Sequence, residues 1–271
     1  MPKRKGTALI TGASAGIGAI YSDRLAKRGH DLILVARNRQ RLASLARRLN
    51  NETGRKVETI QADLTSPADL EGLEDILRST AGISVLVNNA GVGAVRPLIA
   101  SDVDAMDDMI RLNVTALMRL TYAVVPGFVA RGHGTIINIS SVVAIAPEVL
   151  NGVYGGTKAF VLAFSRSLVH ELADKGIRVQ AVLPGATATE FWDVAGKPVH
   201  QLPAQIVMSA DDMVDAALAG FDQEETVTIP SLADKAEWDR HETARLSMSG
   251  KLSSAIPAPR YTRHRRESVS A

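Results

Sequence analysis

Short apolar runs alternate along this chain with longer segments of helical period, and this alternation is the feature that most restricts the fold. The apolar runs are rich in branched side chains and have the usual length of β-strands. They cover residues 7–11, 31–36, 57–62, 84–89, 135–140, 178–183 and 226–230. The helical segments cover residues 17–28, 39–52, 67–79, 104–131 and 154–175. The pattern predicts an α/β fold with a doubly wound, mostly parallel seven-stranded sheet and helices on both faces.

The composition fits one domain of this kind. The chain has 271 residues, 46% of them hydrophobic, which is enough to bury a substantial core. It has no cysteine, so disulfides, a cysteine nucleophile and thiolate zinc sites are excluded, and a cytoplasmic location is expected. Its six histidines are scattered and form no metal-binding pair, so no metal site is expected. We find no signal peptide and no apolar run of membrane-spanning length, so no membrane attachment is expected.

A glycine-rich turn, TGASAGIG at residues 11–18, joins the first expected strand to the first expected helix. Gly12 allows a tight turn, Gly16 allows close approach of a pyrophosphate, and Gly18 allows the helix to pack closely on the sheet. Amide groups at the start of the helix would hold the phosphates. The spacing GxxxGxG differs from the general dinucleotide fingerprint GxGxxG, so a plain glycine turn is the alternative. The position after the first strand of a doubly wound sheet favours nucleotide binding.

The end of the second expected strand, LVARNRQR, bears on which nicotinamide cofactor is used. An acidic residue there would bind the ribose hydroxyl of NAD, and Ala36 cannot accept that hydrogen bond. Arg37 can pair with the additional phosphate of NADP, with Arg39 or Ser14 as a further contact. Arg37 and Arg39 also fit the basic face of the next helix. We predict NADP, with NAD as the less favoured alternative.

Tyr154 and Lys158 are four residues apart on an expected helix, and Ser141 precedes Tyr154 by thirteen residues. The four-residue step places both side chains on one face, where the ammonium would favour the ionised phenol. An isolated tyrosine ionises near a pKa of about 10, which is too high for easy proton exchange. A pair so placed could therefore shuttle protons. The pattern YxxxK is common by chance, so the other motifs must decide.

Together, the motifs of this chain resemble those of the short-chain dehydrogenases and reductases. TGASAGIG, NNAG at 88–91, Asn113, Ser141, YGGTK at 154–158 and PGATAT at 184–189 occur in that family's order and approximate spacing. The resemblance covers about residues 6–230. It implies a Rossmann-like fold, one NADP-binding domain that we place over residues 1–250, and a homodimer or homotetramer formed through the helices 104–131 and 154–175.

The resemblance also implies a mechanism, in which a hydride moves between nicotinamide and a carbonyl or secondary alcohol. Tyr154 would be the general acid/base, Ser141 would fix the substrate oxygen, Lys158 would lower the pKa of Tyr154 and hold the ribose, and Asn113 would keep a water-linked proton path to Lys158. The expected cofactor-binding residues are Gly12, Ser14, Gly16, Ile17, Gly18, Arg37, Asp63, Asn89, Tyr154, Lys158, Pro184, Thr187 and Thr189. Each residue taken alone also fits a plain structural role, such as a turn cap for Ser141.

The stretches 142–153 and 190–210 are expected to overhang the nicotinamide and to select the substrate, the second by closing as a lid. The apolar pocket residues expected there are Val143, Ile145, Leu150, Phe191, Trp192, Val194 and Leu202. No basic cluster would select a carboxylate or phosphate, so an apolar carbonyl or secondary alcohol is preferred. One alternative is an epimerase or dehydratase on the same fold. The other is a nucleotide-sensing protein without chemistry, and the intact Ser141, Tyr154 and Lys158 disfavour this second alternative.

The C-terminal segment differs in composition from the rest of the chain. Residues 251–271 mix proline and serine with arginine, which predicts a basic, flexible tail. We expect no nucleic acid as a partner, since a solvated arm explains the charge. The preceding stretch, 233–249, is expected to form a helix that docks Trp238 and Leu246 on the body or on another subunit.

Overall fold

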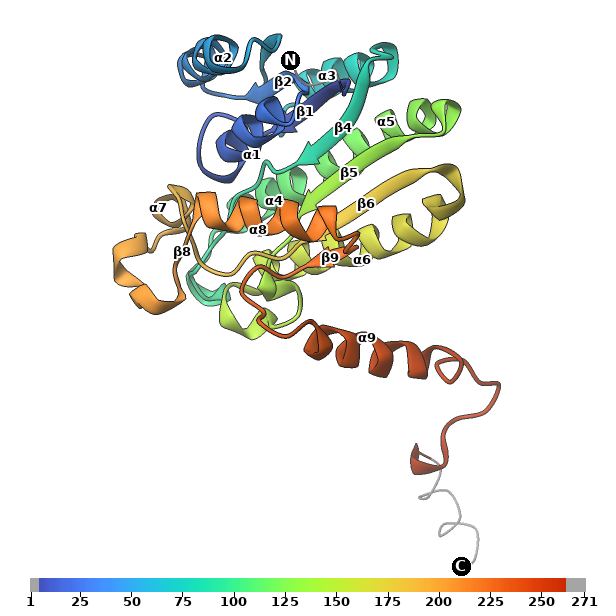
Figure 1. Ribbon diagram of the computed structural model, residues 1–271. Helices are drawn as coiled ribbons and strands as arrows, with labels where there is room; N and C mark the ends of the chain where they lie inside the picture. Colours follow the sequence, from blue (N-terminus) through green and yellow to red (C-terminus); the bar gives the residue numbers. More distant parts are fainter. Residues whose placement is uncertain (1–4, 262–271) are drawn as a thin grey trace, which may run out of the picture. The chain divides into compact units, whose positions relative to one another are not determined.

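One parallel sheet organises the protein in the computed structural model, which describes residues 5–261 (Figure 1). The strand order is β3-β2-β1-β4-β5-β6-β9, so the chain winds outward in one direction from β1 and in the other from β4. The bounds are β1 Thr7–Thr11, β2 Asp31–Ala36, β3 Val57–Gln61, β4 Ile83–Asn88, β5 Gly134–Ile139, β6 Ile177–Val182 and β9 Val227–Thr228. These strands agree with the predicted runs to within about one residue at each end, except that β9 is shorter. The predicted Rossmann-like doubly wound fold is confirmed.

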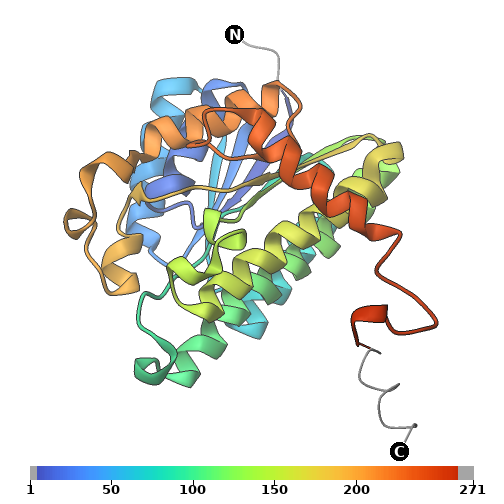
Figure 2. The ribbon, with the colours of Figure 1, turned by 90° about the horizontal axis from the view of Figure 1, so that it is seen from below.

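Helices cover both faces of the sheet (Figure 2). The helices are α1 Gly16–Lys27, α2 Arg39–Thr53, α3 Pro67–Ser79, α4 Val103–Ile110, α5 Leu117–Arg131, α6 Gly152–Leu172, α7 Phe191–Ala195, α8 Ala210–Asp222 and α9 Lys235–Ser249. One core cluster packs α3, α5 and α6 on the sheet, through residues such as Leu73, Phe128 and Leu168. A second cluster packs α1, α2 and α8 on the other face, through residues such as Tyr21 and Met213. The two faces together bury nearly all of β1, β2 and β4.

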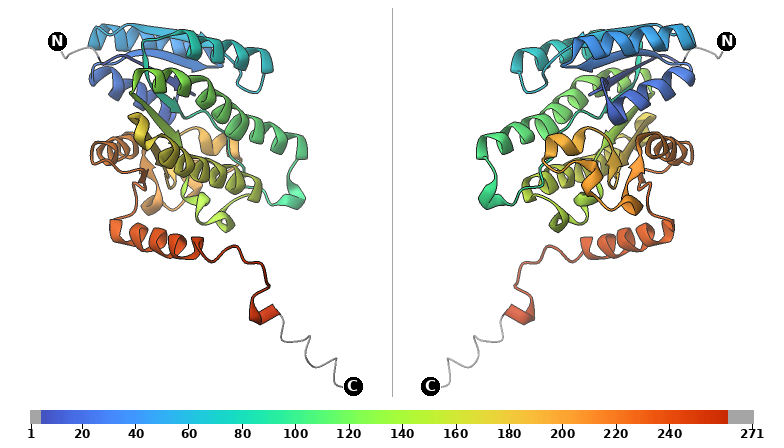
Figure 3. Two further views of the ribbon diagram at one scale, coloured as in Figure 1. Left: turned by 90° about the vertical axis from the view of Figure 1, so that its right-hand side faces the viewer. Right: turned by 90° about the vertical axis from the view of Figure 1, so that its left-hand side faces the viewer.

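The segment predicted as one helix over 104–131 is continuous but irregular. A π-helical segment, Arg111–Ala116, connects α4 to α5. By length and composition the whole run Val103–Arg131 could cross a membrane, with a mean hydropathy of 1.3 over its most apolar window, so our expectation of no such run was wrong. Its apolar side chains Leu120, Val124 and Phe128 are nevertheless buried against the sheet. Figure 3 shows this run beside α6, and 44% of its most apolar window is buried.

Helix α8 and the strands β7 (Thr187–Ala188) and β8 (Met208–Ser209) were not predicted from the sequence patterns. Helix α8 was not predicted, although Ser209 caps its first turn by accepting a hydrogen bond from the Asp212 amide and Asp211 and Asp212 lie near its start. The short strands β7 and β8 pair with each other in a separate small sheet. We call residues 187–209, from β7 to β8, the lid segment.

The chain divides into two units, the first ending at Ser231 and the second beginning at Leu232. The first unit contains the sheet and α1 to α8. The second contains α9, which matches the helix expected over 233–249. We predicted that the enzyme domain ends at residue 250. Docking of this helix through Trp238 and Leu246 stays a prediction. Residues 262–271 of the predicted tail lie outside the described residues.

Candidate active site

A cavity of about 970 Å³ lies at the carboxyl edge of the sheet. Its walls come from the turns after β1, β4, β5 and β6, from the start of α6 and from the lid segment. Because parallel strands of a doubly wound sheet bind ligands where the winding direction changes, the position between β1 and β4 is the expected one. Of the predicted site residues, those that line the cavity are Gly12, Gly16, Ile17, Asn89, Ser141, Tyr154, Lys158, Pro184, Thr187 and Thr189.

The glycine turn requires its glycines for steric reasons. Gly12 has a positive φ of 65°, and a Cβ on it would lie 2.9 Å from Cα of Ala90. Gly18 does not line the cavity, but a Cβ on it would lie only 2.4 Å from the carbonyl oxygen of Gly12. The turn therefore holds the start of α1 against the ends of β1 and β4. A larger side chain at either position would push α1 away from the sheet.

The start of α1 differs from the starts of the other long helices. No side chain caps it, and the residue before it is Ala15. Within residues 5–261, every other α-helix of eight or more residues that starts from a loop has a side-chain cap, namely Asn38, Ser66, Asp102, Asn151, Ser209 or Asp234. The uncapped amides of α1 border the cavity, and uncapped amides at a helix start suit an anion. The residues present thus fit a pyrophosphate at this turn.

Tyr154 and Lys158 lie side by side on the first turns of α6, as their spacing predicts. Both side chains are buried, with 5% and 6% of their surface exposed. Lys158 Nζ lies 5.8 Å from the centre of the Tyr154 ring and donates a hydrogen bond of 2.9 Å to the carbonyl oxygen of Ile139. The phenol and the ammonium therefore reach one cavity from one helix face.

The electrostatics of this pair differ from our expectation. Burial raises the pKa of Tyr154 to about 12, and the hydrogen bond with the Ser141 hydroxyl lowers it only in part. Burial also lowers the pKa of Lys158 to about 8. We expected Lys158 to lower the pKa of the phenol; in this structure desolvation raises that pKa, and the lowering influence comes from the Ser141 hydroxyl. The phenol consequently keeps its proton at neutral pH.

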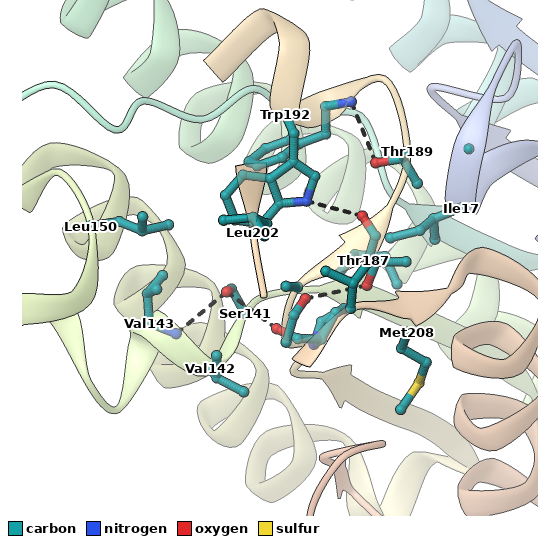
Figure 4. Close-up of a pocket in the computed structure, with 18 of the residues that line it drawn as sticks. Ile17, Ser141, Val142, Val143, Leu150, Thr187, Thr189, Trp192, Leu202 and Met208 are labelled. Atoms are coloured by element: carbon teal, nitrogen blue, oxygen red, sulfur yellow. Dashed lines mark hydrogen bonds between the residues drawn. The ribbon is translucent and has the colours of Figure 1, made fainter. Parts of the chain in front are cut away.

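Ser141 follows β5 and lines the cavity, as Tyr154 does (Figure 4 shows Ser141). It donates a hydrogen bond of 3.3 Å to the carbonyl oxygen of Pro184 and accepts one of 3.3 Å from the Val143 amide. The serine therefore does cap a short 3-10 turn, Val142–Ala144, as its plain structural interpretation predicts. Both bonds are long, and the same hydroxyl faces the cavity.

Asn113 does not line the cavity but lies directly behind it. It is buried in the π-helical segment, where its Nδ2 donates to the Val92 carbonyl oxygen at 2.8 Å and its Oδ1 accepts from the Val92 amide at 3.0 Å. A Cβ on Gly91 would lie 3.0 Å from Asn113 Oδ1 and 3.5 Å from Lys158 Nζ. Asn113 and Lys158 thus border the same small space. Asn113 lies in a π-helical segment, and such segments often mark functional sites.

Two other predicted cofactor residues lie outside the cavity but near each other. Arg37 is exposed after β2, and Asp63 follows β3. Hydrogen bonds from Thr65 hold the pKa of Asp63 below its usual range, and the charge of Arg37 adds to this effect. Arg37 and Asp63 thus follow the two strands, β2 and β3, that lie on one side of β1 and its glycine turn. Ser14, the remaining predicted residue, is half-buried in that turn.

The lid segment closes the other side of the cavity with apolar side chains. Trp192 donates a hydrogen bond of 3.0 Å from Nε1 to the Thr187 carbonyl oxygen (Figure 4). The Phe191 ring packs against the Tyr154 ring, with 5.7 Å between the ring centres. Of the predicted apolar pocket residues, those that line the cavity are Val143, Leu150, Phe191, Trp192 and Leu202. Ile145 and Val194 do not, and Val194 is 69% exposed.

Several cavity residues were not singled out from the sequence. Gly91 lies at the Asn113 and Lys158 space, and its place in NNAG was the available signal. Val149 and Ile206 line the rim of the cavity from opposite segments and are 67% and 56% exposed. Glu190 of the lid segment pairs with Arg41 of α2 at 2.6 Å. No local pattern predicts contacts between segments so distant in sequence.

Comparison with known proteins agrees with this geometry. A family model described as short chain dehydrogenase matches residues 6–198. The chain belongs to the short chain dehydrogenase family. The resemblance inferred from the motifs is therefore confirmed.

Two solved structures are similar to this protein over almost the whole chain. A short-chain dehydrogenase from Sphingobium yanoikuyae, in complex with NADPH, is 50% identical with a TM-score of 0.91, and the match covers 96% of this chain and 99% of that one. A bulky-bulky ketone specific alcohol dehydrogenase from Comamonas testosteroni is 45% identical with a TM-score of 0.88, covering 96% and 99% of the two chains. Both matches extend past the family model's end at residue 198.

The curated relatives are longer proteins. A very-long-chain 3-oxoacyl-CoA reductase from Anas platyrhynchos is 36% identical over 208 residues, which cover 72% of this chain and 64% of that protein. The 17-beta-hydroxysteroid dehydrogenase type 3 from Homo sapiens is 35% identical over 215 residues, covering 78% and 66%. The chain thus spans about two thirds of the length of these two relatives.

Proposed function

We propose that this protein is an NADP-dependent oxidoreductase that interconverts an apolar ketone and the corresponding secondary alcohol. The observation that carries the proposal is the cavity itself. The hydroxyls of Ser141 and Tyr154 meet at the junction between the glycine turn and an apolar wall built by Leu150, Trp192 and Leu202. A ketone needs this combination, because its oxygen requires donors and its substituents require apolar contacts.

The chain's own residues would hold the cofactor along the carboxyl edge of the sheet. The glycine turn and the uncapped amides of α1 would bind the pyrophosphate. The Arg37 guanidinium would pair with the additional phosphate of NADP, and the chain offers Ala36, not an acid, at the end of β2. NADPH, when bound, would supply the hydride. The Sphingobium relative in complex with NADPH supports this assignment.

Proton transfer would be the task of Tyr154. With a pKa of about 12, the buried phenol is protonated at neutral pH, which is the form that donates a proton to a ketone oxygen. Ser141 would hold that oxygen by a hydrogen bond, and such preorganised donors stabilise developing charge. Lys158 would stabilise the phenolate left after transfer, because its ammonium lies beside the ring. The free protein therefore holds Tyr154 in the protonated form that reduction of a ketone requires.

The shape of the apolar wall favours a ketone with two large substituents. One group would lie against Trp192 and Leu202 in the lid segment, and the other would pass between Val149 and Ile206 at the rim. These rim residues are exposed, so a long substituent could extend beyond the cavity. The Comamonas relative, named for bulky-bulky ketones, supports this substrate class.

The test is a panel of ketones and secondary alcohols incubated with the full chain and either NADPH or NADH, monitored by nicotinamide absorbance. We expect NADPH consumption with bulky aryl or cycloalkyl ketones, with one alcohol formed per NADPH. Tighter binding of NADH than of NADPH would contradict the cofactor assignment. Product without net NADPH turnover would indicate an epimerase or dehydratase, and binding without any turnover would indicate a nucleotide sensor.

A further inference from the structure

Thr157 connects the catalytic helix to the π-helical segment through a side chain that no part of the mechanism above uses. It immediately precedes Lys158 in α6 and is 3% exposed. Its hydroxyl donates a hydrogen bond of 2.8 Å to the carbonyl oxygen of Tyr154. The Thr157 hydroxyl oxygen in turn accepts a hydrogen bond of 3.1 Å from Asn113 Nδ2. A single buried hydroxyl thus joins Tyr154 and Asn113.

The hydrogen-bond directions in this contact follow from the number of protons available. A threonine hydroxyl has one proton, and the Tyr154 carbonyl oxygen can only accept. The hydroxyl therefore donates its proton to the Tyr154 carbonyl oxygen and can only accept from Asn113. The donor on Asn113 must be its NH2 group. Thr157 is consequently compatible with only one of the two orientations of the Asn113 amide.

The backbone of Val92 requires the same orientation. Its carbonyl oxygen accepts from Asn113 Nδ2 at 2.8 Å, and its amide donates to Asn113 Oδ1 at 3.0 Å. All the hydrogen bonds of the Asn113 side chain thus agree, and a reversed amide would lose each of them. Such a loss is costly because the group is buried.

The selected orientation decides what faces Lys158. Asn113 Oδ1 and Lys158 Nζ both border the space beside Gly91, at 3.0 Å and 3.5 Å from the point that a Cβ there would occupy. A carbonyl oxygen at this place favours an ammonium, whereas an NH2 group would oppose it. The orientation of this amide therefore decides whether an oxygen or an NH2 group shares that space with the Lys158 ammonium.

We propose that Thr157 is a positioning residue, whose hydroxyl holds the Asn113 amide with Oδ1 towards Lys158 and so supports proton transfer by Tyr154. This inference rests on the proposed ketone reduction. Thr157 touches neither substrate nor cofactor in it and acts through Asn113. The residue lies inside YGGTK, but the tyrosine and lysine of that motif gave no reason to assign it a role.

Substitution by valine tests the proposal, because valine keeps the shape of threonine and removes both hydrogen bonds. We expect Thr157→Val to lower kcat by about tenfold, as loss of part of a proton-transfer arrangement would. The KM for the ketone should stay within about twofold of the wild-type value, and the pH profile of kcat should shift. Thr157→Ser keeps the hydroxyl and should recover kcat to within about threefold of wild type. Thr157→Ala serves as a second variant if the valine protein does not fold.

A readout without activity separates this proposal from the proposed function. In the full chain with 13C-labelled lysine, NMR titration should show that Thr157→Val lowers the pKa of Lys158 below its wild-type value and that Thr157→Ser restores it. Lys158→Met assigns the signal. If the wild type reduces no ketone, the proposed function fails while this titration still tests Thr157. An unchanged titration would overturn the proposal, as would unchanged kcat and pH profile in valine and alanine variants whose melting temperatures fall. Failure of serine to restore either property would do the same.

Discussion

The wall of the cavity that carries Ser141, Tyr154 and Lys158 is assembled from strand ends and a buried helix, whereas the facing wall consists of the lid segment. On the first wall these three side chains are at most 8% exposed. On the second, α7 and two short 3-10 turns, Val199–Gln201 and Ala204–Ile206, replace longer elements. Buried walls open rarely and exposed short segments open readily, because fewer apolar contacts hold them. Under the proposed function, the first wall would carry the chemistry and the second would select the substrate.

The largest effect should come from the phenol on the buried wall. Tyr154→Phe removes the proton donor and leaves the ring that packs on Phe191. We expect kcat for ketone reduction to fall by about 10²- to 10⁴-fold, the usual contribution of general acid catalysis. Steady-state kinetics and fluorescence titration with NADPH would measure this, and NADPH affinity should change little. Retention of full activity by the variant would remove the phenol from the mechanism.

The next effect concerns pH and separates the buried lysine from exposed ones. Burial lowers the pKa of Lys158 to about 8, so the free protein loses this positive charge as the pH rises through that value. Because an anionic cofactor favours the charged form, NADPH affinity should fall by about three- to tenfold between neutral pH and the alkaline side of this pKa. Calorimetry across this pH range would show it.

Two lysine variants sharpen this expectation. Lys158→Met should bind NADPH more weakly and remove the pH dependence. Lys175→Met, which changes an exposed lysine paired with Asp174, should keep it. An equal pH dependence in wild type and Lys158→Met would mean that another group titrates.

A smaller effect is expected at the rim of the exposed wall. Ile206→Ala removes apolar contacts from a side chain that lines the cavity and is 56% exposed. We expect kcat/KM for a bulky ketone to fall by about three- to tenfold, because lost methylene contacts in an apolar pocket have effects of this order or larger. Ile99→Ala is the matched control, since Ile99 is 94% exposed and does not line the cavity. Equal changes in the two variants would argue against a substrate path past Ile206.

The smallest effect should come from the exposed ion pair that links the lid segment to α2. Arg41 and Glu190 are 2.6 Å apart, but their side chains are 49% and 62% exposed. Exposed ion pairs contribute little because water and salt screen them. Arg41→Gln and Glu190→Gln should each change NADPH affinity by less than about threefold, and the double variant should show little coupling. A large coupling in a double-mutant cycle would mean that the pair controls closure of the lid segment.

How far the sequence predicts this molecule depends on whether the signal is local. Strands such as β2 were predicted to the residue because branched apolar runs have a local pattern. The spacing of Tyr154 and Lys158 likewise placed both on one helix face. The π-helical segment around Asn113 has no such pattern, because its geometry arises from packing against Val92 and α6. A single long helix was the natural prediction there.

Electrostatics and long-range contacts were also beyond local patterns. Proximity to Lys158 suggested a lowered pKa for Tyr154, but the extent of burial, which decides the sign, depends on the complete fold. The hydrogen bond between Asn113 and Thr157 joins residues 44 positions apart in sequence. Arg41 and Glu190, which also contact each other, are 149 positions apart in sequence. Pairing of subunits through the helices 104–131 and 154–175 stays a prediction.

The division between the two walls is tested most directly by the ratio of kcat/KM for a ketone with two bulky substituents to that for a small ketone such as acetone. We predict that Tyr154→Phe lowers both values and leaves their ratio within about twofold of wild type, because general acid catalysis serves every ketone equally. Ile206→Ala should lower the ratio by about three- to tenfold through the bulky ketone alone. A changed ratio in Tyr154→Phe together with an unchanged ratio in Ile206→Ala would contradict the account.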